Sequence, residues 1–329
     1  MGDYYGGRRV LVTGGAGFIG SHLVERLVER GAQVTVLDNL SGGNVANLAS
    51  VTGEVSLHKF DLVHDGLGPV LDDGGFELIF HLAGMADPAA SVEEPRKDFE
   101  RNLLSTFNLL EALTHFSPAT RLLNTSSALV YGNAPDPPWR ETAPTHPVAP
   151  YGVSKLAAET YVGVFAQLRG LRAVTVRLFG VFGPRLRKQV VYDLMRKLDV
   201  QTDELHLQGT GAERRDMTYV SNVVDAMTLV AEKAPALGET YNVGTGEAVS
   251  IRYLAEAICE EMNIKPRLVF AGNPRPGDVT VFVGDVSRLE QLGYKRQIAL
   301  RDGLARTIAW FREESEPGRA DNGAVAEPV

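Results

Sequence analysis

The chain has 329 residues, a length that suggests two domains or one large domain with an appendage. Apolar residues make up 44% of it and charged residues 22%, the proportions of a globular protein with a substantial core. The 33 basic residues against 41 acidic ones give a net charge of −8, which argues against a nucleic-acid-binding protein and against a basic membrane-surface protein.

Membrane, targeting and cysteine signals are sparse. No segment reaches the roughly 18 consecutive apolar residues of a membrane span, and the start of the chain lacks the basic-then-apolar order of a signal peptide. The single cysteine, Cys259, excludes an internal disulfide and a multi-cysteine metal site. We therefore expect a cytoplasmic protein with no metal site and no membrane partner.

Strand-like and helix-like segments alternate through the first half of the chain. Strands are predicted at 9–13, 33–37, 77–81, 120–124 and 173–177, and helices at 19–30, at 99–113 and from about 151. Repeated strand–helix–strand units predict an α/β fold, a Rossmann-like doubly wound parallel sheet with helices on both faces. After residue 177 the alternation becomes irregular, and residues 241–244 are typical of one more short strand that would return to the main sheet.

A glycine-rich turn joins the first predicted strand to the first helix, with glycines at 14, 15, 17 and 20. Such a turn offers a bare backbone that a pyrophosphate can approach and a helix N-terminus that points at the anion. Asp38 ends the second strand, where a carboxylate would bind a ribose diol and repel the extra phosphate of NADP. A plain tight turn would explain the glycines alone, and a solvated loop acid would explain Asp38 alone. The glycine turn and Asp38 together predict bound NAD.

A second pattern points to proton transfer. Tyr151 and Lys155 stand at i and i+4 of a predicted helix and share one face of it. An ammonium near a phenol favours the phenolate and lowers its pKa, which makes the tyrosine a proton acceptor at neutral pH. Ser126 and Ser127 end a strand at the carboxyl edge of the sheet, where a hydroxyl can hold a substrate oxygen. The alternatives are that Tyr151 and Lys155 form an ordinary surface pair and that Ser126 and Ser127 belong to an ordinary Ser/Thr turn. The nucleotide-binding motif upstream disfavours both alternatives.

Further motifs follow in order almost to Trp310, among them Gly183-Pro-Arg185, Arg215-Asp216 and Tyr241-Asn-Val-Gly244. With all of these, the chain resembles an extended short-chain dehydrogenase/reductase of the nucleotide-sugar epimerase and dehydratase branch, most like UDP-glucose and UDP-glucuronate 4-epimerases. The resemblance implies a catalytic base at Tyr151, a residue at Lys155 that binds the nicotinamide ribose and tunes that base, and the catalytic Ser/Thr at Ser127. Cofactor contacts are implied for Gly14, Gly17, Phe18, Ile19, Gly20, Asp38, Asn39, Asp61, Leu62, Leu82, Ala83, Gly84, Asn102, Tyr151 and Lys155.

Substrate contacts follow from the same resemblance. They are implied for Ser126, Ser127, Gly180, Arg215, Arg275 and Phe282. The two arginines would grip the substrate diphosphate, because guanidinium groups pair bidentately with phosphate oxygens. The family usually has asparagine at the position of Gly180, and Phe282 falls where some epimerases vary the bulk of a gate residue. An aromatic gate would disfavour an N-acetyl group.

The two residues after Ser127 limit which of the family's reactions the chain is expected to catalyse. The family begins by oxidising a sugar hydroxyl with NAD to a keto-sugar, and a 4,6-dehydratase then usually needs an Asp-Glu pair, or a decarboxylase a Glu, in this stretch. Ala128 and Leu129 stand there instead, and neither transfers a proton. We expect epimerisation at C4 of a nucleoside-diphosphate sugar, with a UDP sugar favoured, through a transient 4-keto intermediate. Uronic-acid, hexose and deoxy-sugar substrates all stay open.

Two alternatives stay open. The chain would be a dehydratase or decarboxylase if an acid from elsewhere, such as Asp87 or Glu93, served the second step. A non-catalytic NAD-binding sensor or scaffold is the non-enzyme alternative, although such proteins typically lose the tyrosine–lysine pair. The resemblance also implies a homodimer, formed through the helices that begin near Phe99 and Tyr151.

The domain boundaries are predicted from the same patterns. Residues 8–178 with about 216–259 would form the NAD-binding Rossmann domain, and about 179–215 with 260–312 a smaller, interleaved α/β domain for the nucleotide sugar. Residues 313–329 have the composition of a disordered tail.

Overall fold

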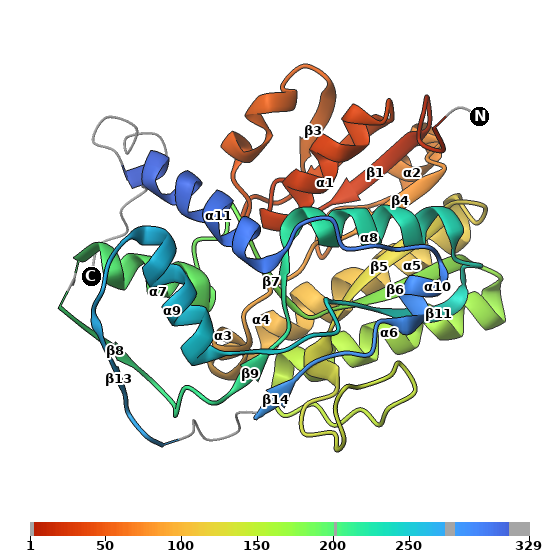
Figure 1. The fold of residues 1–329 in the computed structure, drawn as a ribbon. Coiled ribbons are helices and arrows are strands. Elements are labelled where there is room, and N and C mark those ends of the chain that lie inside the picture. Colours follow the sequence, from red (N-terminus) through yellow and green to blue (C-terminus); the bar gives the residue numbers. More distant parts are fainter. Residues whose placement is uncertain (1–2, 201–202, 274–279, 316–329) are drawn as a thin grey trace.

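The computed structural model describes residues 3–200, 203–273 and 280–315 (Figure 1). Its centre is a parallel sheet of seven strands in the order β11-β6-β5-β4-β1-β2-β3. The strands are β1 (Arg9–Thr13), β2 (Gln33–Asp38), β3 (Val55–Lys59), β4 (Leu78–His81), β5 (Arg121–Ser127), β6 (Arg172–Leu178) and β11 (Leu237–Val243). This order confirms the predicted doubly wound α/β fold. The chain adds β2 and β3 on one side of β1 and then β4, β5, β6 and β11 on the other side, so the winding reverses between β1 and β4.

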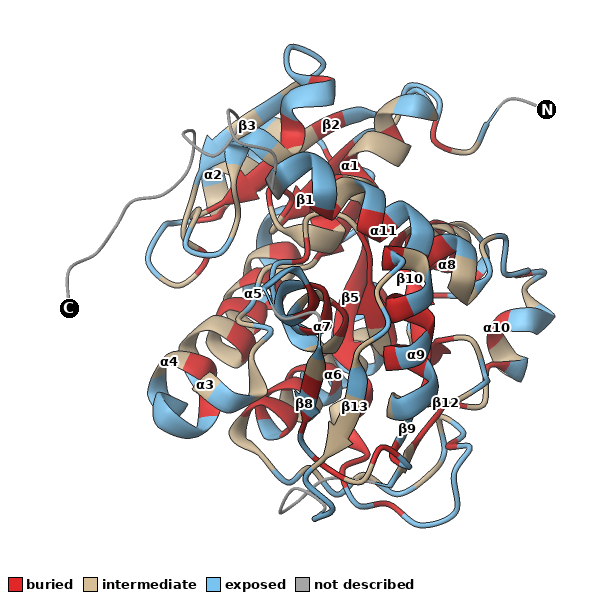
Figure 2. Cartoon of the chain, turned by 60° about the vertical axis from the view of Figure 1, so that its left-hand side comes forward, coloured by how far each residue is buried: buried red, intermediate tan, exposed pale blue. Residues whose placement is uncertain are grey.

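Helices cover both faces of the sheet because successive strand residues point to opposite sides (Figures 1 and 2). Val10 and Val12 pack in the same core cluster as α1 and α8, whereas Leu11 packs with α2, α5 and α6. These helices are α1 (Phe18–Glu29), α8 (Val220–Lys233), α2 (Gly68–Gly74), α5 (Ser105–Phe116) and α6 (Pro150–Arg169). The central strands are therefore buried on both sides, as Figure 2 shows by the red centre of the sheet.

The helix predicted at 99–113 is longer and less regular than expected. Helix α4 (Pro95–Phe99), a π-helical turn η2 (Glu100–Leu104) and α5 follow one another without a gap. Pro95 opens α4 and ends the preceding helix, α3 (Pro88–Glu93), because proline fits the first helical turn but not a helix interior. The π-helical turn contains Asn102, one of the predicted cofactor residues, and such turns are frequent at functional sites.

Smaller elements lie at the carboxyl edge of the main sheet and beyond it. Strands β7 (Gly180–Phe182) and β10 (Met217–Tyr219) form one parallel pair, and β8 (Glu204–Leu207) and β13 (Arg267–Phe270) another. Strand β9 (Arg214–Arg215) lies between β12 (Val249–Ser250) and β14 (Val281–Phe282). The remaining helices are η1 (Val45–Val51), η3 (Ala128–Val130), α7 (Gln189–Val200), α9 (Ile251–Met262), α10 (Ser287–Gln291) and α11 (Leu300–Ser315).

The chain returns to the main sheet late, as the sequence predicted. Residues 241–243 belong to β11, which pairs with β6 at the sheet's edge. Helix α9 packs against α7 and α11, and α11 continues to Ser315, so the first residues of the predicted tail are helical. The rest of that tail lies outside the described residues, and the division into two domains stays a prediction.

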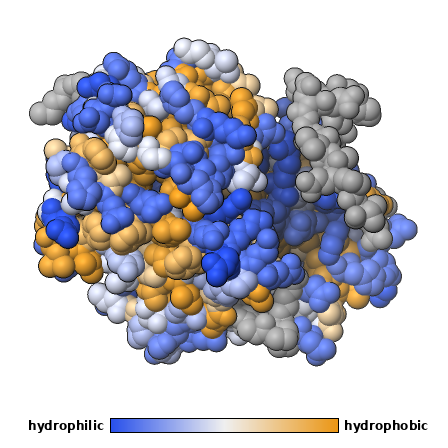
Figure 3. All heavy atoms as spheres, turned by 180° about the vertical axis from the view of Figure 1, so that it is seen from behind, coloured by the Kyte–Doolittle hydropathy of each residue, from blue (hydrophilic) through white to orange (hydrophobic). Residues whose placement is uncertain are grey.

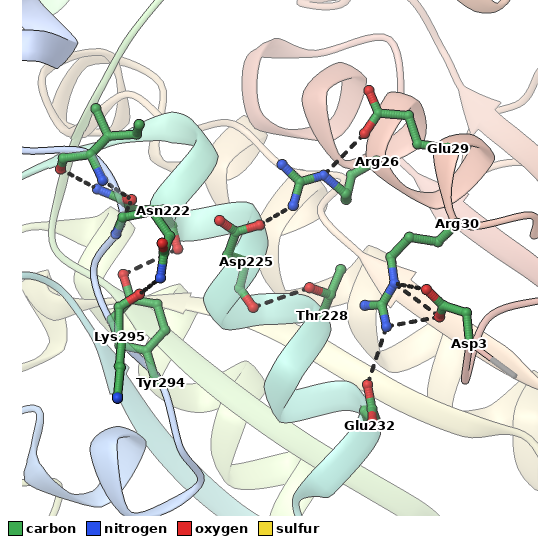
Figure 4. Close-up of polar contacts among 12 residues, drawn as sticks. Asp3, Arg26, Glu29, Arg30, Asn222, Asp225, Thr228, Glu232, Tyr294 and Lys295 are labelled. Carbon is green, nitrogen blue, oxygen red and sulfur yellow. Dashed lines mark hydrogen bonds and ion pairs between the residues drawn. The ribbon is translucent and has the colours of Figure 1, made fainter. Parts of the chain in front are cut away.

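Polar contacts fasten α8 to its neighbours on both sides (Figure 4). Arg26 of α1 pairs with Asp225, and Arg30, which caps the C-terminus of α1, pairs with Glu232. The Asn222 side chain donates to the Ile298 carbonyl at 2.8 Å and accepts from the Ile298 amide at 3.0 Å, so it satisfies both backbone groups of that residue. The segment that leads into α11 is thereby attached to the helix layer of the main sheet.

No helix in the described part of the chain combines the length and the apolar character that crossing a bilayer requires. On the face shown in Figure 3, apolar residues form several patches separated by polar ones.

Candidate active site

The glycine turn after β1 is packed too closely for side chains. Gly14 has a φ of +72°, and a Cβ on it would lie 2.7 Å from the amide nitrogen of Ala83 in the loop after β4. A Cβ on Gly20 would overlap the carbonyl oxygen of Gly14. Both glycines are therefore required by the contact between the turn, α1 and the next strand, which places Leu82, Ala83 and the turn at one edge of the sheet.

The N-terminus of α1 fits a pyrophosphate. Its N-cap is Gly17, no side chain of the described residues caps it, and its first turn carries no acidic residue. The free amide groups and the positive end of the helix dipole are left for an anion. A Cβ on Gly17 would touch only the Gly14 carbonyl oxygen, at 3.2 Å, so here the missing side chain opens the approach rather than serving the packing. Phe18 and Ile19, both half-buried, follow directly.

Asp38 lies beside the same turn. Its carboxylate accepts hydrogen bonds from the amides of Ala16, at 3.0 Å, and Leu40, at 2.8 Å. These bonds fix a negative charge at the end of β2, the position at which a dinucleotide's ribose diol is bound in such folds. The carboxylate thus links the glycine turn to β2, and its placement agrees with the predicted preference for NAD over NADP.

A hollow of about 380 Å³ lies next to Asp38. Asn39 donates to Asp61 across it, with 2.9 Å between the side-chain nitrogen and oxygen. The lining residues are Asn39, Ser41, Lys59, Phe60, Asp61, Asp65 and Arg101. Asn39 and Asp61, two of the predicted cofactor contacts, therefore lie together at this hollow. Leu62 is instead buried in the core beneath them and does not line the hollow.

Tyr151, Lys155 and Ser127 come together where β5 ends and α6 begins. Tyr151 lies in the first turn of α6, and its backbone amide donates to Ser91 Oγ at 3.2 Å. Lys155 Nζ donates to the Thr125 carbonyl oxygen at 3.0 Å. The Ser127 side chain is hydrogen-bonded to the Tyr151 phenol. The i, i+4 spacing and the strand-end position thus produce the predicted constellation of phenol, ammonium and hydroxyl.

The protonation of this constellation differs from the prediction. Burial raises the pKa of Tyr151 to about 12, and the Ser127 hydrogen bond lowers it only in part. Burial also lowers the pKa of Lys155 to about 8, against the charge of Asp98, which raises it. The predicted lowering of the tyrosine pKa by Lys155 is therefore wrong for the chain's own groups, because loss of water around the phenolate dominates and Lys155 is not among the groups that shift this pKa.

Asn102 is held at the centre of a hydrogen-bond network. Its side-chain oxygen accepts from the Met85 amide at 3.0 Å, and its nitrogen donates to Asp98 at 2.7 Å. Ser154, next to Lys155 on α6, also donates to Asp98, at 2.6 Å. A Cβ on Gly84 would lie 2.6 Å from the Asn102 oxygen and 3.4 Å from Lys155 Nζ, so these groups border one space. Sequence reasoning missed Asp98, although its i, i+4 spacing to Asn102 was a usable signal.

His81 ends β4 behind this network. Its two ring nitrogens form hydrogen bonds with Thr13, at 2.7 Å, and Thr106, at 3.0 Å. Full burial and the charge of Lys155 lower its pKa to about 3, so the ring is neutral at physiological pH. A neutral imidazole here joins the ends of β1 and β4 without adding a second cation near Lys155.

The predicted substrate residues fall into three groups. Arg215 and Phe282 pair side by side in β9 and β14. Ser126 is buried, and its hydroxyl has no hydrogen-bond partner among the described residues. Arg275 lies outside the described residues.

Gly180, another of the predicted substrate positions, has no room for an asparagine side chain. Its amide donates to the Asp216 carbonyl oxygen at 3.0 Å, where β7 meets β10. A Cβ on Gly180 would lie 2.6 Å from that oxygen and 2.9 Å from Met217 Sδ. The two strands have closed over the position, so no side chain fits there without a backbone shift.

Phe282 belongs to an aromatic cluster rather than standing alone. Its ring centroid lies 5.3 Å from that of Trp139 and 5.4 Å from that of Phe179. Leu129 packs against this cluster and Ala128 is part of it. The two positions after Ser127, where an acid pair would serve a dehydratase, are thus embedded in an apolar wall.

One further segment, residues 183–188, crosses from α1 to the loop after β4, and we refer to it as the strap. Arg185 pairs with Glu25 of α1 at 2.6 Å, and the Pro184 carbonyl oxygen lies 3.1 Å from His22 Nε2. At the other end Lys188 donates to the Ala86 carbonyl oxygen at 2.8 Å. The strap therefore bridges the two sides of the point where the sheet's winding reverses.

Known proteins match nearly the whole chain in sequence and in structure. A family profile described as GDP-mannose 4,6 dehydratase matches residues 11–307. The UDP-glucose 4-epimerase of Mycolicibacterium smegmatis is 35% identical over 315 residues, which cover 94% of this chain and 100% of that protein. The crystal structure of UDP-glucose 4-epimerase from Thermotoga maritima, with UDP-glucose, is 34% identical with a TM-score of 0.86, covering 93% of this chain and 99% of that one.

The chain belongs to the NAD-dependent nucleotide-sugar epimerase and dehydratase family. It is an enzyme of this extended short-chain dehydrogenase/reductase family, as the sequence motifs predicted. The family also includes DesIV of Streptomyces venezuelae, a dTDP-glucose 4,6-dehydratase with NAD bound in its structure, which is 29% identical with a TM-score of 0.84 and covers 93% of this chain and 97% of that one.

Proposed function

We propose that this family member is an NAD-dependent 4-epimerase of a nucleoside-diphosphate sugar, with a UDP sugar favoured. The observation that carries the proposal is the apolar wall after Ser127. Tyr151, together with Lys155 and Ser127, can transfer one proton while one hydride leaves the sugar. Ala128 and Leu129 provide no second acid or base beside these residues. Similarity to epimerases such as the UDP-glucose-bound protein of Thermotoga maritima supports the same choice.

The residues around the glycine turn would hold NAD. The uncapped N-terminus of α1 fits the pyrophosphate, Asp38 fits a ribose diol, and the hollow beside Asn39 and Asp61 fits the adenine. When bound, NAD supplies the hydride acceptor and, in its oxidised form, a positively charged ring.

The chain's own residues would carry the proton. Tyr151 accepts the proton of the C4 hydroxyl while the hydrogen on C4 leaves as hydride, which yields a 4-keto sugar. Ser127, hydrogen-bonded to the phenol, would hold the same substrate oxygen. Lys155, held by the Thr125 carbonyl oxygen one helical turn from Tyr151, would bind the nicotinamide ribose. Return of the hydride to the other face of the keto group and of the proton from Tyr151 gives the C4 epimer, with no net redox change.

The acids proposed for a dehydratase or decarboxylase are placed unfavourably. Asp87 caps α3 by accepting from the Ala90 amide at 3.1 Å and lies 3.9 Å from Lys188. Glu93 is exposed at the end of α3. Neither position resembles a proton donor held against the sugar, which favours epimerisation. Retention of the full tyrosine–lysine–serine set likewise disfavours a sensor or scaffold without catalysis.

The deciding experiment incubates the purified protein with UDP-glucose, UDP-glucuronate and dTDP-glucose and identifies the products by NMR. The proposal expects a C4 epimer of one of these sugars, with every carbon and oxygen retained. Loss of water or carbon dioxide from the sugar would reject it. Tyr151→Phe should abolish turnover and keep NAD bound, whereas Tyr253→Phe on the outer side of α9 should change neither.

We infer, in addition, a homodimer formed through the helical segment that runs from Phe99 into α5 and through α6. Their outer surfaces expose Phe99, Val153, Tyr161, Val164 and Leu168. Such a row of apolar side chains on packed helices is typical of a helical interface. Light scattering on the purified protein tests this: the native chain should have twice the monomer mass, and Leu168→Glu should weaken the association.

A further inference from the structure

We propose that Asp98 is a positioning residue for the tyrosine–lysine pair: it orients Asn102 and Ser154, and its charge sets the pH range in which Tyr151 and Lys155 work together. This proposal rests on the proposed function only for the roles of Tyr151 and Lys155. Asp98 touches neither group directly; it acts through the groups that it holds and through its field.

The position of Asp98 is unusual for a carboxylate. It is 0% exposed, yet among the described residues it forms no direct ion pair. Its partners are two neutral donors, Ser154 Oγ at 2.6 Å and Asn102 Nδ2 at 2.7 Å. A buried charge without an ion pair is expensive for a fold, so its presence beside a catalytic pair calls for a functional explanation.

The two donors connect Asp98 to both sides of the site. Ser154 precedes Lys155 on α6, so the bond from Ser154 fixes the rotation of that helix face. Asn102 carries the bond onward to Met85, beside the space bordered by Gly84 and Lys155. The carboxylate thus joins α4, the π-helical turn and α6 at the point where Lys155 enters the site.

Other charges near Asp98 are engaged elsewhere. On its own segment Lys97 pairs with Glu94, Arg101 donates to Ser41, and Arg96 is exposed. From α6 the groups that its field reaches are Tyr151 and Lys155. From β4, His81 faces Lys155 and is neutral. The negative charge therefore acts mainly on the two catalytic groups.

The direction of that action is the same for both groups. A negative charge favours the ammonium form of Lys155 and disfavours the phenolate form of Tyr151, so it raises both pKa values. Removing the charge without changing the shape, by Asp98→Asn, should lower both. Both limbs of the pH–rate profile should then move to lower pH, by about one unit.

The first test follows single-turnover reduction of bound NAD by a sugar nucleotide across pH. This half-reaction is common to epimerases, dehydratases and decarboxylases, so an error in the proposed product does not affect it. Asp98→Asn should shift both limbs downward, and Asp98→Glu should restore the native profile. Asp302→Asn, in the exposed first turn of α11, controls for the general effect of a helix-start carboxylate. A lower rate at every pH with unmoved limbs would overturn the proposal.

The second test does not need a substrate. Titration of carbon-13-labelled tyrosine by NMR, with Tyr151→Phe to assign the signal, should show a lower Tyr151 pKa in Asp98→Asn than in the native enzyme. An unchanged Tyr151 pKa would overturn the proposal even if no sugar nucleotide proved active. If both Asp98→Asn and Asp98→Ser fail to fold, the carboxylate is a determinant of the fold, and the proposal is likewise rejected.

Discussion

Lys155 Nζ donates a hydrogen bond to the carbonyl oxygen of Thr125, 3.0 Å away, and so ties the first turns of α6 to the end of β5. The ammonium is buried, and burial lowers its pKa from 10.5 to about 8. This contact fixes the cation one helical turn from Tyr151, in a buried position that disfavours a charge. Under the proposed function, the same residue would serve catalysis while its burial lowers stability.

Lys155→Met should stabilise the protein at neutral pH and inactivate it. Because the folded-state pKa is depressed below the ordinary value, the cost of burying the ammonium is fully present below about pH 8 and is relieved as the pH rises towards 10.5. We expect a gain of ~1–3 kcal/mol at pH 7 that disappears by about pH 10.5, from chemical denaturation at several pH values. Hydride transfer should fall by roughly 10²–10⁴. A variant that is less stable than the native protein at pH 7 would contradict this account.

The glycine turn predicts a graded response to alanine. Gly20→Ala should destabilise the protein by ~1–3 kcal/mol and remove bound NAD, because the new Cβ would overlap the Gly14 carbonyl. Gly17→Ala meets only a 3.2 Å contact and should fold normally while binding NAD more weakly. Thermal unfolding and the NAD content of the purified variants measure the two effects. Equal loss of stability in both variants would show that Gly17, too, serves packing.

Gly180 cannot be converted to the family's usual residue at no cost. Gly180→Asn should destabilise the protein, since the Cβ would stand 2.6 Å from the Asp216 carbonyl oxygen across the β7–β10 pair. We expect ~1–3 kcal/mol by denaturant unfolding, without a gain in affinity for a sugar nucleotide. Gly42→Asn, at an exposed site with open space around it, is the matched control. Tighter substrate binding by Gly180→Asn would mean that the two strands separate easily.

The strap predicts how fast NAD leaves. Arg185→Ala removes the ion pair to Glu25 and should raise the dissociation rate of NAD about tenfold, the equivalent of ~1.4 kcal/mol. Arg187→Ala removes the exposed ion pair with Glu314 and a contact with the Trp310 ring, and should leave the rate unchanged. Exchange of bound NAD against a labelled excess measures both. Identical rates in the native enzyme and Arg185→Ala would mean that the strap does not restrain the cofactor.

Local patterns predicted the elements that matter most for the site. Alternating strands and helices, the glycine turn and the Tyr151–Lys155 spacing each depend on residues close in sequence, and the structure contains all three. Strand β3 was missed because it lies at the sheet's edge with several exposed residues and so lacks a buried-strand pattern. Helices α2 and α8 were not predicted either.

Tertiary effects explain the rest. The raised pKa of Tyr151 comes from burial, which no sequence spacing reports. The packing of β10 against Gly180 depends on a segment that begins some 36 residues later, counted from Gly180 to Asp216. Asp98 had a visible spacing to Asn102, but nothing in the sequence indicated that it would be fully buried beside α6.

The strap has a physiological consequence under the proposed function. A 4-epimerase returns its hydride within each turnover, so it needs no fresh cofactor. An NAD molecule held behind the Arg185–Glu25 pair would exchange with the cellular pool far more slowly than sugars pass through the site. The enzyme would then be insulated from changes in the ratio of NAD to NADH in the cell, and interconversion of its sugars would continue at the same rate when metabolism turns reducing.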